Sequence, residues 1–154
     1  MITDKIRERL RRETIVFREV RHEPTRTSEE SARARGEDLR IGGKALLIKV
    51  DADFRLFVLS ADRKLDSSAI RAHFAAKKTR FASPEELMQL TGLVPGSVPP
   101  FGQPILPFPL YVDPSVFENQ RIAFNAGSLT DSIIMGIDDY RRLATPEIFT
   151  FAAS

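Results

Sequence analysis

The chain of 154 residues lacks cysteine, which excludes disulfides, thiolate metal sites and a cysteine nucleophile together. It has only two histidines, His22 and His73, so a histidine-rich metal cluster is also excluded. No apolar run is long enough to span a bilayer, and the first residues lack the apolar segment of a secretory signal. We therefore expect a cytoplasmic protein with no metal, no cofactor and no membrane partner.

The signatures of several enzyme classes are absent as well. The sequence holds no P-loop, no G-x-G-x-x-G fingerprint, no H-E-x-x-H zinc motif and no G-x-S-x-G nucleophile elbow. An excess of one charge is missing too, because 23 basic residues face 21 acidic ones. This balance argues against a protein that coats nucleic acid through charge alone. Basic residues do gather in segments 7–21 and 71–80. The simpler interpretation is that these residues form solvated helix faces, and the alternative is that they contact a few nucleic-acid phosphates.

Apolar periodicity and turn residues predict a single α+β domain over residues 1–154, largely antiparallel and without βαβ regularity or internal repeats. Strands are expected at 15–21, 44–50, 54–60, 79–81, 110–113, 121–125 and 132–137, and helices at 4–12, 28–34, 67–74, 84–91 and 138–143. Thr27 or Ser28 is the predicted N-cap of the second helix and Ser83 that of the fourth, Gly36 is a predicted helix end, and Asp138 is the predicted cap of the last helix.

The segment from Leu93 to Pro109 contains six prolines, which exclude a helix and a central strand. It is too apolar for a disordered linker, so we expect a stiff, ordered loop, and such loops in compact domains are often functional. Within it, the glycines at 96 and 102 permit close backbone approach, and the neighbouring prolines can fix amides that point at a ligand. A purely structural turn fits the local sequence equally well.

Lys44 follows two glycines and opens an apolar strand, where an ammonium needs a partner, a cleft or water. It could hold a phosphate, carboxylate or carbonyl oxygen, although a strand-end lysine that reaches solvent is the simpler interpretation. His22 lies where a strand gives way to a loop, and Asn125 begins a turn of small residues and offers both a donor and an acceptor. His73 is expected at the surface, and Asp113 is expected to cap a helix.

At these residues the sequence resembles the YbaK family, which includes the editing domain inserted in bacterial prolyl-tRNA synthetases. The resemblance spans nearly the whole chain, and the order and spacing of its pieces are more specific than any single piece. The pieces are His22-Glu-Pro, Thr27-Ser-Glu-Glu, Gly43-Lys44-Ala-Leu, Ser83-Pro-Glu-Glu-Leu, Thr91-Gly, Pro95-Gly-Ser-Val-Pro-Pro-Phe-Gly, Tyr111-Val-Asp and Phe124-Asn-Ala-Gly. The pieces around Ser83 and Phe124 are most similar to the free-standing YeaK-like branch.

The resemblance implies an α+β fold around a partly closed sheet flanked by short helices. It also implies hydrolysis of the ester between an amino acid and the terminal adenosine of a mischarged tRNA. The family lysine corresponds to Lys44, and the family G-x-x-x-P loop corresponds to Gly96 through Pro100. We expect Lys44 to hold the substrate end while backbone amides at Gly96, Ser97 and Val98 polarise the ester carbonyl. A positioned water then attacks, because no Ser–His or Cys–His pair is evident.

By the same resemblance, the amino acid is expected to be small or hydroxylated, namely Ser, Thr or Ala. The residues expected to bind it are His22, Pro100, Phe101, Asn125, Gly127 and Ser128. Three alternatives stay open: a cysteinyl- or alanyl-tRNA(Pro) deacylase, a non-catalytic member that binds tRNA or a synthetase, and a small-molecule module that uses the same Lys44 cleft. We expect a monomer whose partner is mischarged tRNA, with a synthetase as a further candidate partner.

Overall fold

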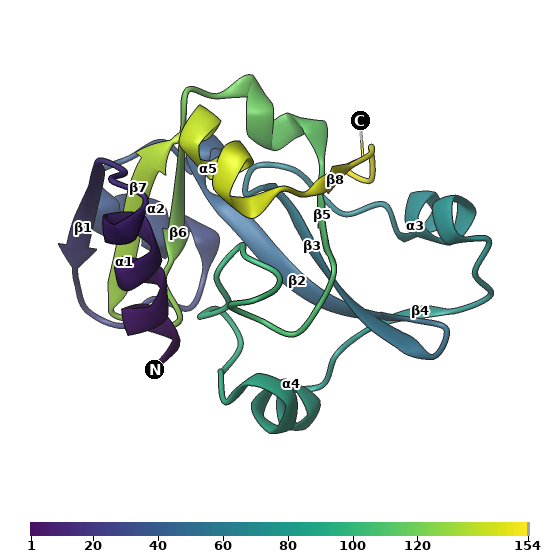
Figure 1. The fold of residues 1–154 in the computed structure, drawn as a ribbon. Helices are drawn as coiled ribbons and strands as arrows, with labels where there is room; N and C mark the ends of the chain where they lie inside the picture. The colour runs from purple at the N-terminus through teal and green to yellow at the C-terminus, as the bar shows by residue number, and fades with distance from the viewer. Residues whose placement is uncertain (154) are drawn as a thin grey trace.

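The computed structural model describes residues 1–153, so Ser154, the last residue of the predicted domain, lies outside the described residues. In chain order the elements are α1 (Ile2–Arg12), β1 (Phe17–Arg21), α2 (Ser28–Arg35), the 3-10 turn η1 (Leu39–Ile41), β2 (Gly43–Val50), β3 (Asp53–Ser60), α3 (Ser67–Phe74), β4 (Thr79–Phe81), α4 (Pro84–Thr91), β5 (Leu110–Val112), the 3-10 turn η2 (Pro114–Glu118), β6 (Arg121–Asn125), β7 (Asp131–Gly136), α5 (Ile137–Ala144) and β8 (Glu147–Ile148). Figure 1 shows α1, β1 and β7 on one side of the long β2–β3 hairpin, and α3 and β4 on the other. None of the described helices is long and apolar enough to cross a membrane.

The strands form two open sheets, so the prediction of one partly closed sheet was wrong. One sheet has the order β1-β7-β6, and the other has the order β4-β2-β3-β5-β8. The division arises because β7 pairs with β1 and β6, and among the described residues an isolated bridge links β6 at Ala123 to Gly42, the residue before β2. The two sheets therefore meet at the beginning of β2.

The α+β class and the largely antiparallel arrangement are confirmed. β2 pairs with β3 and β4, and β7 pairs with β1 and β6, all antiparallel. β5 pairs parallel with β3 and with β8. The sequence did not predict β8, since a two-residue strand carries no periodicity that can be recognised.

Local capping chemistry sets the ends of the short helices. Thr27 and Ser83 each form a capping box, in which the hydroxyl accepts a hydrogen bond from the backbone of the third helical residue and a glutamate there returns one. Gly36 ends α2 in the left-handed conformation, as predicted. Asp138 is not the cap of α5, because Gly136 holds that position and Asp138 lies in the first helical turn.

The proline-rich segment between α4 and β5 is an ordered loop that is packed into the core, as predicted. Phe101, Leu106 and Phe108 are buried in the main hydrophobic cluster. The phenol hydroxyl of Tyr140 on α5 donates a 2.6 Å hydrogen bond to the carbonyl oxygen of Pro100. Full burial raises the pKa of this phenol, so it stays a neutral donor. The buried side chains and the hydrogen bond from Tyr140 thus hold the backbone of the loop in place.

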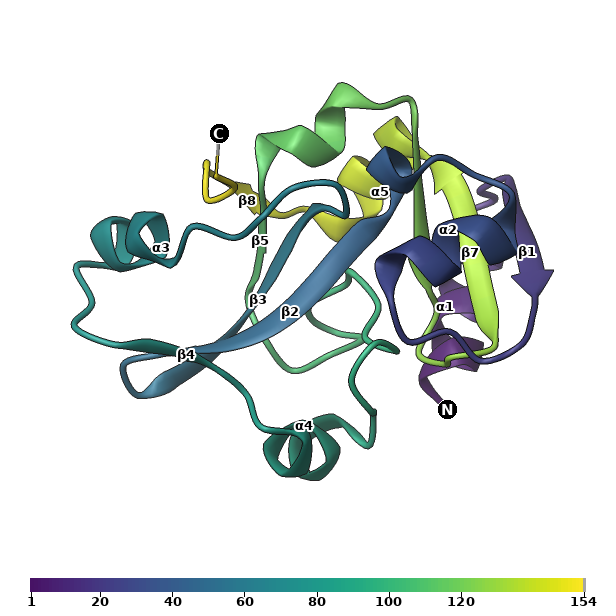
Figure 2. The same cartoon turned by 180° about the vertical axis from the view of Figure 1, so that it is seen from behind.

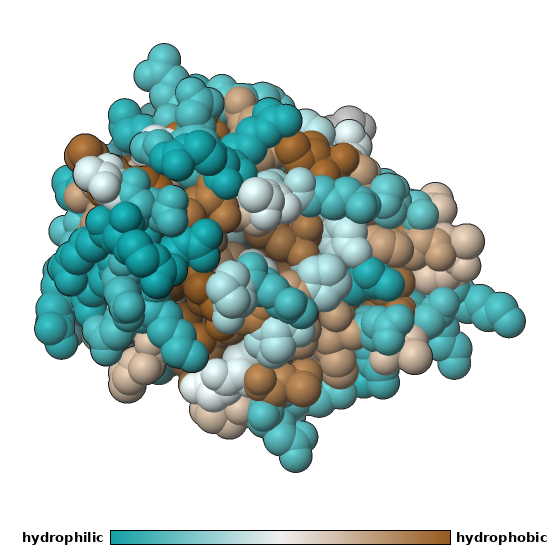
Figure 3. Space-filling model, viewed as in Figure 1, coloured by the Kyte–Doolittle hydropathy of each residue, from teal (hydrophilic) through white to brown (hydrophobic). Residues whose placement is uncertain are grey.

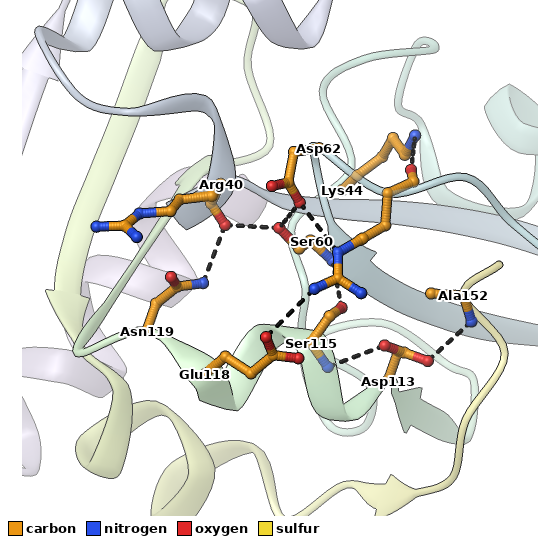
Figure 4. Close-up of polar contacts among 10 residues, drawn as sticks. Arg40, Lys44, Ser60, Asp62, Asp113, Ser115, Glu118, Asn119 and Ala152 are labelled. Atoms are coloured by element: carbon orange, nitrogen blue, oxygen red, sulfur yellow. Dashed lines mark hydrogen bonds and ion pairs between the residues drawn. The ribbon is translucent and has the colours of Figure 1, made fainter. Parts of the chain in front are cut away.

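The C-terminal segment is fixed by Asp113, which Figure 4 shows beside Ser115 and Ala152. The Asp113 carboxylate accepts hydrogen bonds from the backbone amides of Ser115, Phe151 and Ala152 at 2.9, 2.7 and 2.8 Å. Its role as the cap of η2 was predicted, whereas its hold on the C-terminal segment was not. Aromatic rings of Phe57, Phe151 and their neighbours pack over this segment.

Polar and apolar side chains are unevenly distributed over the surface. Figure 3 shows hydrophilic groups dominating the side where α1 lies, and hydrophobic groups reaching the surface near α4. On α4, Met88 and Leu90 are 49% and 43% exposed. Singly exposed apolar residues are normal in globular proteins.

Candidate active site

A cleft of about 190 Å³ opens between α2, the start of β2, the loop at Gly96 and the end of β6. Figure 2 shows α2 facing the beginning of β2. The lining residues come from five separate segments: Arg26, Thr27, Ser28, Ser31 and Arg35; Gly42, Gly43, Lys44, Ala45 and Leu46; Ala61; Gly96 and Val98; and Asn125. Four of the predicted site residues, at positions 44, 96, 98 and 125, are thereby brought together from distant parts of the chain.

Two glycines permit the backbone geometry of the cleft. A Cβ at Gly43 would lie 2.7 Å from the side chain of Ile122, so glycine allows β2 to approach β6 closely. Gly96 has a φ of +88°, in the left-handed region where residues with a Cβ are strained. A side chain at either position would move one wall of the cleft.

Lys44 is the second residue of β2 and pairs with Leu59 on β3, at the end of the hairpin away from its turn. Its side chain is half-buried, and its Nζ donates one hydrogen bond of 3.3 Å to the carbonyl oxygen of Arg63. Figure 4 shows this contact at the tip of the extended side chain. Because an ammonium has three N–H donors, donors remain for a ligand in the cleft.

The charged side chains that line the cleft are all cationic. They are Arg26, Arg35 and Lys44, and no acidic residue is among the lining residues. The nearby carboxylate of Glu37 is occupied by Arg18 and Arg121, each at 2.7 or 2.8 Å. A cleft of this kind favours an anionic or strongly polar ligand.

Arg35 is a site residue that the sequence analysis missed. Its side chain is only 8% exposed, and burial lowers the pKa of its guanidinium to about 10, so the charge persists at neutral pH. Its Nε donates to the Ser132 hydroxyl at 2.9 Å, and its Nη2 donates to Asn125 Oδ1 at 3.1 Å. Nothing local distinguishes this arginine from the exposed Arg33 on the same polar helix, so only the tertiary structure identifies it.

Asn125 lines the cleft, but both ends of its amide are used inside the protein. Its Oδ1 accepts from Arg35 and from the Ser132 hydroxyl, and its Nδ2 donates to the carbonyl oxygen of Gly96 at 2.7 Å. Asn125 therefore supports the Gly96 loop, which we define as residues 96–100. One of the two N–H donors of its amide is used in this contact, and its binding of the amino acid stays a prediction.

Within the Gly96 loop, the structure separates Ser97 from its neighbours. Ser97 is buried, its amide donates to the carbonyl oxygen of Val94, and its hydroxyl bonds to the backbone of the same residue. The amides of Gly96 and Val98 have no acceptor among residues 1–153. The predicted amide donors are thus available at Gly96 and Val98, while Ser97 is occupied in holding the turn.

Pro100 and Phe101 lie outside the cleft, so the prediction that Phe101 forms a pocket wall was wrong. Phe101 is 3% exposed, and its ring packs edge-on against Phe124 and Tyr140 in the core. Pro100 is buried and accepts the hydrogen bond from Tyr140 described above. Burial of a phenyl ring in the main core stabilises the loop more than a place at a small polar cleft would.

His22 lies behind the cleft and forms a Ser–His pair that the sequence did not reveal. Its Nε2 is 2.8 Å from the Ser132 hydroxyl, and its Nδ1 is 2.8 Å from the carbonyl oxygen of Glu23. Ser132 is fully buried and its hydroxyl also contacts Arg35 and Asn125. A hydroxyl with three internal contacts and no access to the cleft is not placed to act as a nucleophile.

The remaining predicted residues, Gly127 and Ser128, are turn residues. Gly127 has a φ of +79° and packs closely on Ile2, and the Ser128 hydroxyl bonds to Thr130. Neither lines the cleft.

As predicted, His73 lies at the surface, 2.9 Å from Glu147. Among residues 1–153, no group of three or more His, Asp or Glu side chains is placed to hold a metal ion.

Comparison with known proteins then decides the family. Residues 22–143, which contain every residue that lines the cleft, match the aminoacyl-tRNA editing domain. The chain belongs to the aminoacyl-tRNA editing domain family. The resemblance to the YbaK-like proteins is thereby confirmed, and the cleft is the candidate active site of an editing domain.

Individual relatives of this editing domain agree with the match. The chain is 40% identical over 141 residues to the multifunctional Ser/Thr-tRNA deacylase ProXp-y of Escherichia coli (strain K12), covering 88% of this chain and 83% of the relative. It is 35% identical over 101 residues to a proline–tRNA ligase of Shouchella clausii (strain KSM-K16), covering 66% of this chain and 18% of that protein. Among solved structures, a chain proposed to be a trans-editing enzyme for prolyl tRNA synthetase has a TM-score of 0.83 at 24% identity, covering 99% of this chain and 97% of that chain. This likeness supports the fold.

Proposed function

We propose that this protein is a trans-acting deacylase that hydrolyses the ester joining a mischarged serine, threonine or alanine to the 3′ adenosine of a tRNA. The observation that carries the proposal is the cationic cleft that brings Lys44 to the Gly96 loop inside an editing domain. The 3′ end of a tRNA is polyanionic, so such a cleft attracts it. The 40% identity to a Ser/Thr-tRNA deacylase supports the choice of amino acid.

The proposed reaction is direct attack by water on the ester carbonyl. Lys44 holds the substrate end through its phosphate or carbonyl oxygen, and the free amides of Gly96 and Val98 stabilise the developing negative charge on the carbonyl oxygen. The water oxygen bonds to the carbonyl carbon, the bond from that carbon to the ribose oxygen breaks, and the ribose oxygen takes up a proton. The vicinal ribose hydroxyl or the substrate amine can help to activate the water, so the reaction needs no protein base.

Hydroxyl groups on α2 support a preference for hydroxylated amino acids. Ser28 lines the cleft, and its hydroxyl makes no hydrogen bond within residues 1–153. A hydroxyl can both donate to and accept from a substrate hydroxyl. Alanine would fit the same space without this bond, so serine and threonine are expected to react faster.

The proposed partner is a mischarged tRNA in the cytoplasm, bound by a monomer. Because mischarged tRNA is made by aminoacyl-tRNA synthetases, a synthetase is the further partner that we propose. The reaction releases a free amino acid and an uncharged tRNA, which a synthetase can charge again.

A second candidate is a deacylase of alanyl- or cysteinyl-tRNA(Pro). It is favoured by the 35% identity to part of a proline–tRNA ligase. The two candidates share the cleft and the reaction, and they differ in which tRNA and amino acid are accepted.

The test is deacylation by the wild-type protein of tRNAs charged with Ser, Thr, Ala, Gly, Cys and Pro. We expect rapid loss of the seryl and threonyl esters, slower loss of the alanyl ester, and no loss of the prolyl ester. Preferential loss of alanyl- or cysteinyl-tRNA(Pro) would establish the second candidate instead. If the protein binds tRNA and no ester is lost, the family member is a binding protein and the proposed function is wrong.

A further inference from the structure

Arg35 is a buried cation whose partners in the protein are neutral. It is the last residue of α2, and no carboxylate lies within ion-pair distance of it among the described residues. Two of its three nitrogens are used, one by the Ser132 hydroxyl and one by Asn125 Oδ1. The Glu37 carboxylate acts on Arg35 only from a distance, and burial outweighs it and lowers the pKa of the guanidinium. Burying a charge without a direct ion pair is costly, so a buried guanidinium that joins two neutral side chains calls for a functional reason.

The contacts of Arg35 determine how the Asn125 amide is oriented. The guanidinium can only donate hydrogen bonds, so the amide must present its oxygen to Arg35 and its nitrogen to the carbonyl oxygen of Gly96. The reversed amide would place donor against donor at Arg35 and acceptor against acceptor at Gly96. Arg35 therefore makes Asn125 a donor toward the Gly96 loop.

The peptide that joins Gly96 to Ser97 is consequently held at both ends. Its oxygen accepts from Asn125 Nδ2 at 2.7 Å, and its nitrogen donates to the carbonyl oxygen of Val94 at 3.1 Å. The adjoining amides of Gly96 and Val98 are the two in this turn without a protein acceptor. Fixing the central peptide restrains the two neighbouring peptides, which carry these two amides.

We propose that Arg35 is a positioning residue for the deacylation reaction: through Asn125 it sets the Gly96–Ser97 peptide so that the amides of Gly96 and Val98 can bind the ester carbonyl oxygen. This inference rests on the proposed function and deepens it. Arg35 acts from behind the cleft wall, and the amides are the groups that contact the substrate. Oxyanion donors are effective only when they are held in place before the reaction begins.

The experiment compares Arg35→Lys and Asn125→Ala with a matched control, Arg121→Lys, in deacylation of seryl-tRNA. Lysine keeps the charge but, as a single-point donor, does not bridge Ser132 and Asn125 in the manner of the guanidinium. We expect kcat to fall about 10- to 100-fold in both cleft variants with little change in KM, because small displacements of catalytic groups are costly. The exposed Arg121 side chain pairs with Glu37 and does not line the cleft, so its variant should keep the wild-type kcat.

The double variant, Arg35→Lys with Asn125→Ala, tests whether the two residues act along one path. Residues that act through each other are not additive, so the double variant should lose no more kcat than the more damaged single variant. A loss equal to the product of the two single losses would overturn the proposal. A folded Arg35→Lys protein with wild-type kcat would overturn it as well, and if that variant does not fold, the kcat of Asn125→Ala decides in the same way.

Amide hydrogen exchange gives a second measurement that does not depend on turnover. If Arg35 positions the loop, exchange of the Ser97 amide, which donates to the carbonyl oxygen of Val94, should be faster in Arg35→Lys and Asn125→Ala than in the wild type and in Arg121→Lys. Unchanged exchange of the Ser97 amide would contradict the proposal. A wild-type protein that hydrolyses no ester would contradict the proposed function instead, so the two failures can be told apart.

Discussion

Arg35 and Asp113 are the two charged side chains that are buried among the described residues, at 8% and 2% exposure. Asp113 is surrounded by three backbone amide donors and ties the C-terminal segment to the η2 turn. Arg35 has two neutral acceptors, and its Nη1, close to Gly42, makes no hydrogen bond within residues 1–153. Asp113, whose carboxylate has three backbone donors, stabilises the fold. Arg35, which keeps unused donors, lies at the cleft.

This difference gives a way to separate structural charges from functional ones in a small domain. A charge whose hydrogen bonds are completed by the backbone stabilises the fold wherever it lies. A buried charge that keeps unused donors has a stability cost that the fold does not recover. Substitutions at Asp113 should therefore affect folding, while substitutions at Arg35 should affect the rate of the folded protein.

The largest effect on stability is expected from Asp113→Ala. Three backbone amides would lose a buried acceptor, and we expect the free energy of unfolding to fall by about 3 kcal/mol. For a domain of this size that corresponds to a Tm lower by roughly 6 to 12 °C. Thermal unfolding followed by circular dichroism measures the change.

The kcat of the Asp113→Ala protein that remains folded should equal that of the wild type, because Asp113 does not line the cleft. A Tm within a degree of the wild type would show that the Asp113 contacts do not hold the C-terminal segment. A large loss of kcat in the folded Asp113→Ala protein would contradict the claim that Asp113 affects folding and Arg35 the reaction rate.

A smaller effect is expected on the free energy of unfolding at acid pH, when the wild type is compared with Asp113→Asn. Burial alone would raise the pKa of Asp113, but hydrogen bonds from Ser115, Phe151 and Ala152 outweigh it and hold the pKa below its usual value. The ionised carboxylate therefore contributes stability above the unfolded-state pKa of about 3.9, and this contribution is lost as the pH falls through the lower folded-state pKa. The stability difference between the two proteins should shrink below about pH 4, as urea titrations across that range can establish. A difference that stays constant would contradict the assigned contacts.

The features that the sequence predicted well depend on neighbours along the chain. Ser83 was identified as a cap by its hydroxyl and the glutamate three residues later, and of the two candidates Thr27 and Ser28 the structure selects Thr27. The strands of the β2–β3 hairpin were predicted from two largely apolar runs separated by a short connection. The predicted cap at Asp138 failed because Gly136 already begins the helix, a difference of two residues that propensity does not resolve.

The features that the sequence did not predict depend on distant contacts. The division into two sheets follows from the pairing of β1 with β7, which are separated by most of the chain. Arg35 contacts Ser132 and Asn125, which lie 97 and 90 positions further along. The positions of Lys44 and the Gly96 loop came from the family resemblance, and the structure adds that they line one cleft.

The most direct test of the central claim compares Lys44→Ala with Lys5→Ala in deacylation of seryl-tRNA. Both substitutions remove one ammonium, but Lys5 is exposed on α1 and does not line the cleft. Our account predicts that kcat/KM falls by about 100-fold or more in a normally folded Lys44→Ala protein, the size of loss seen when a group that stabilises developing charge is removed. It predicts little change in Lys5→Ala. A folded Lys44→Ala protein that deacylates as fast as the wild type would contradict the claim that this cleft is the active site.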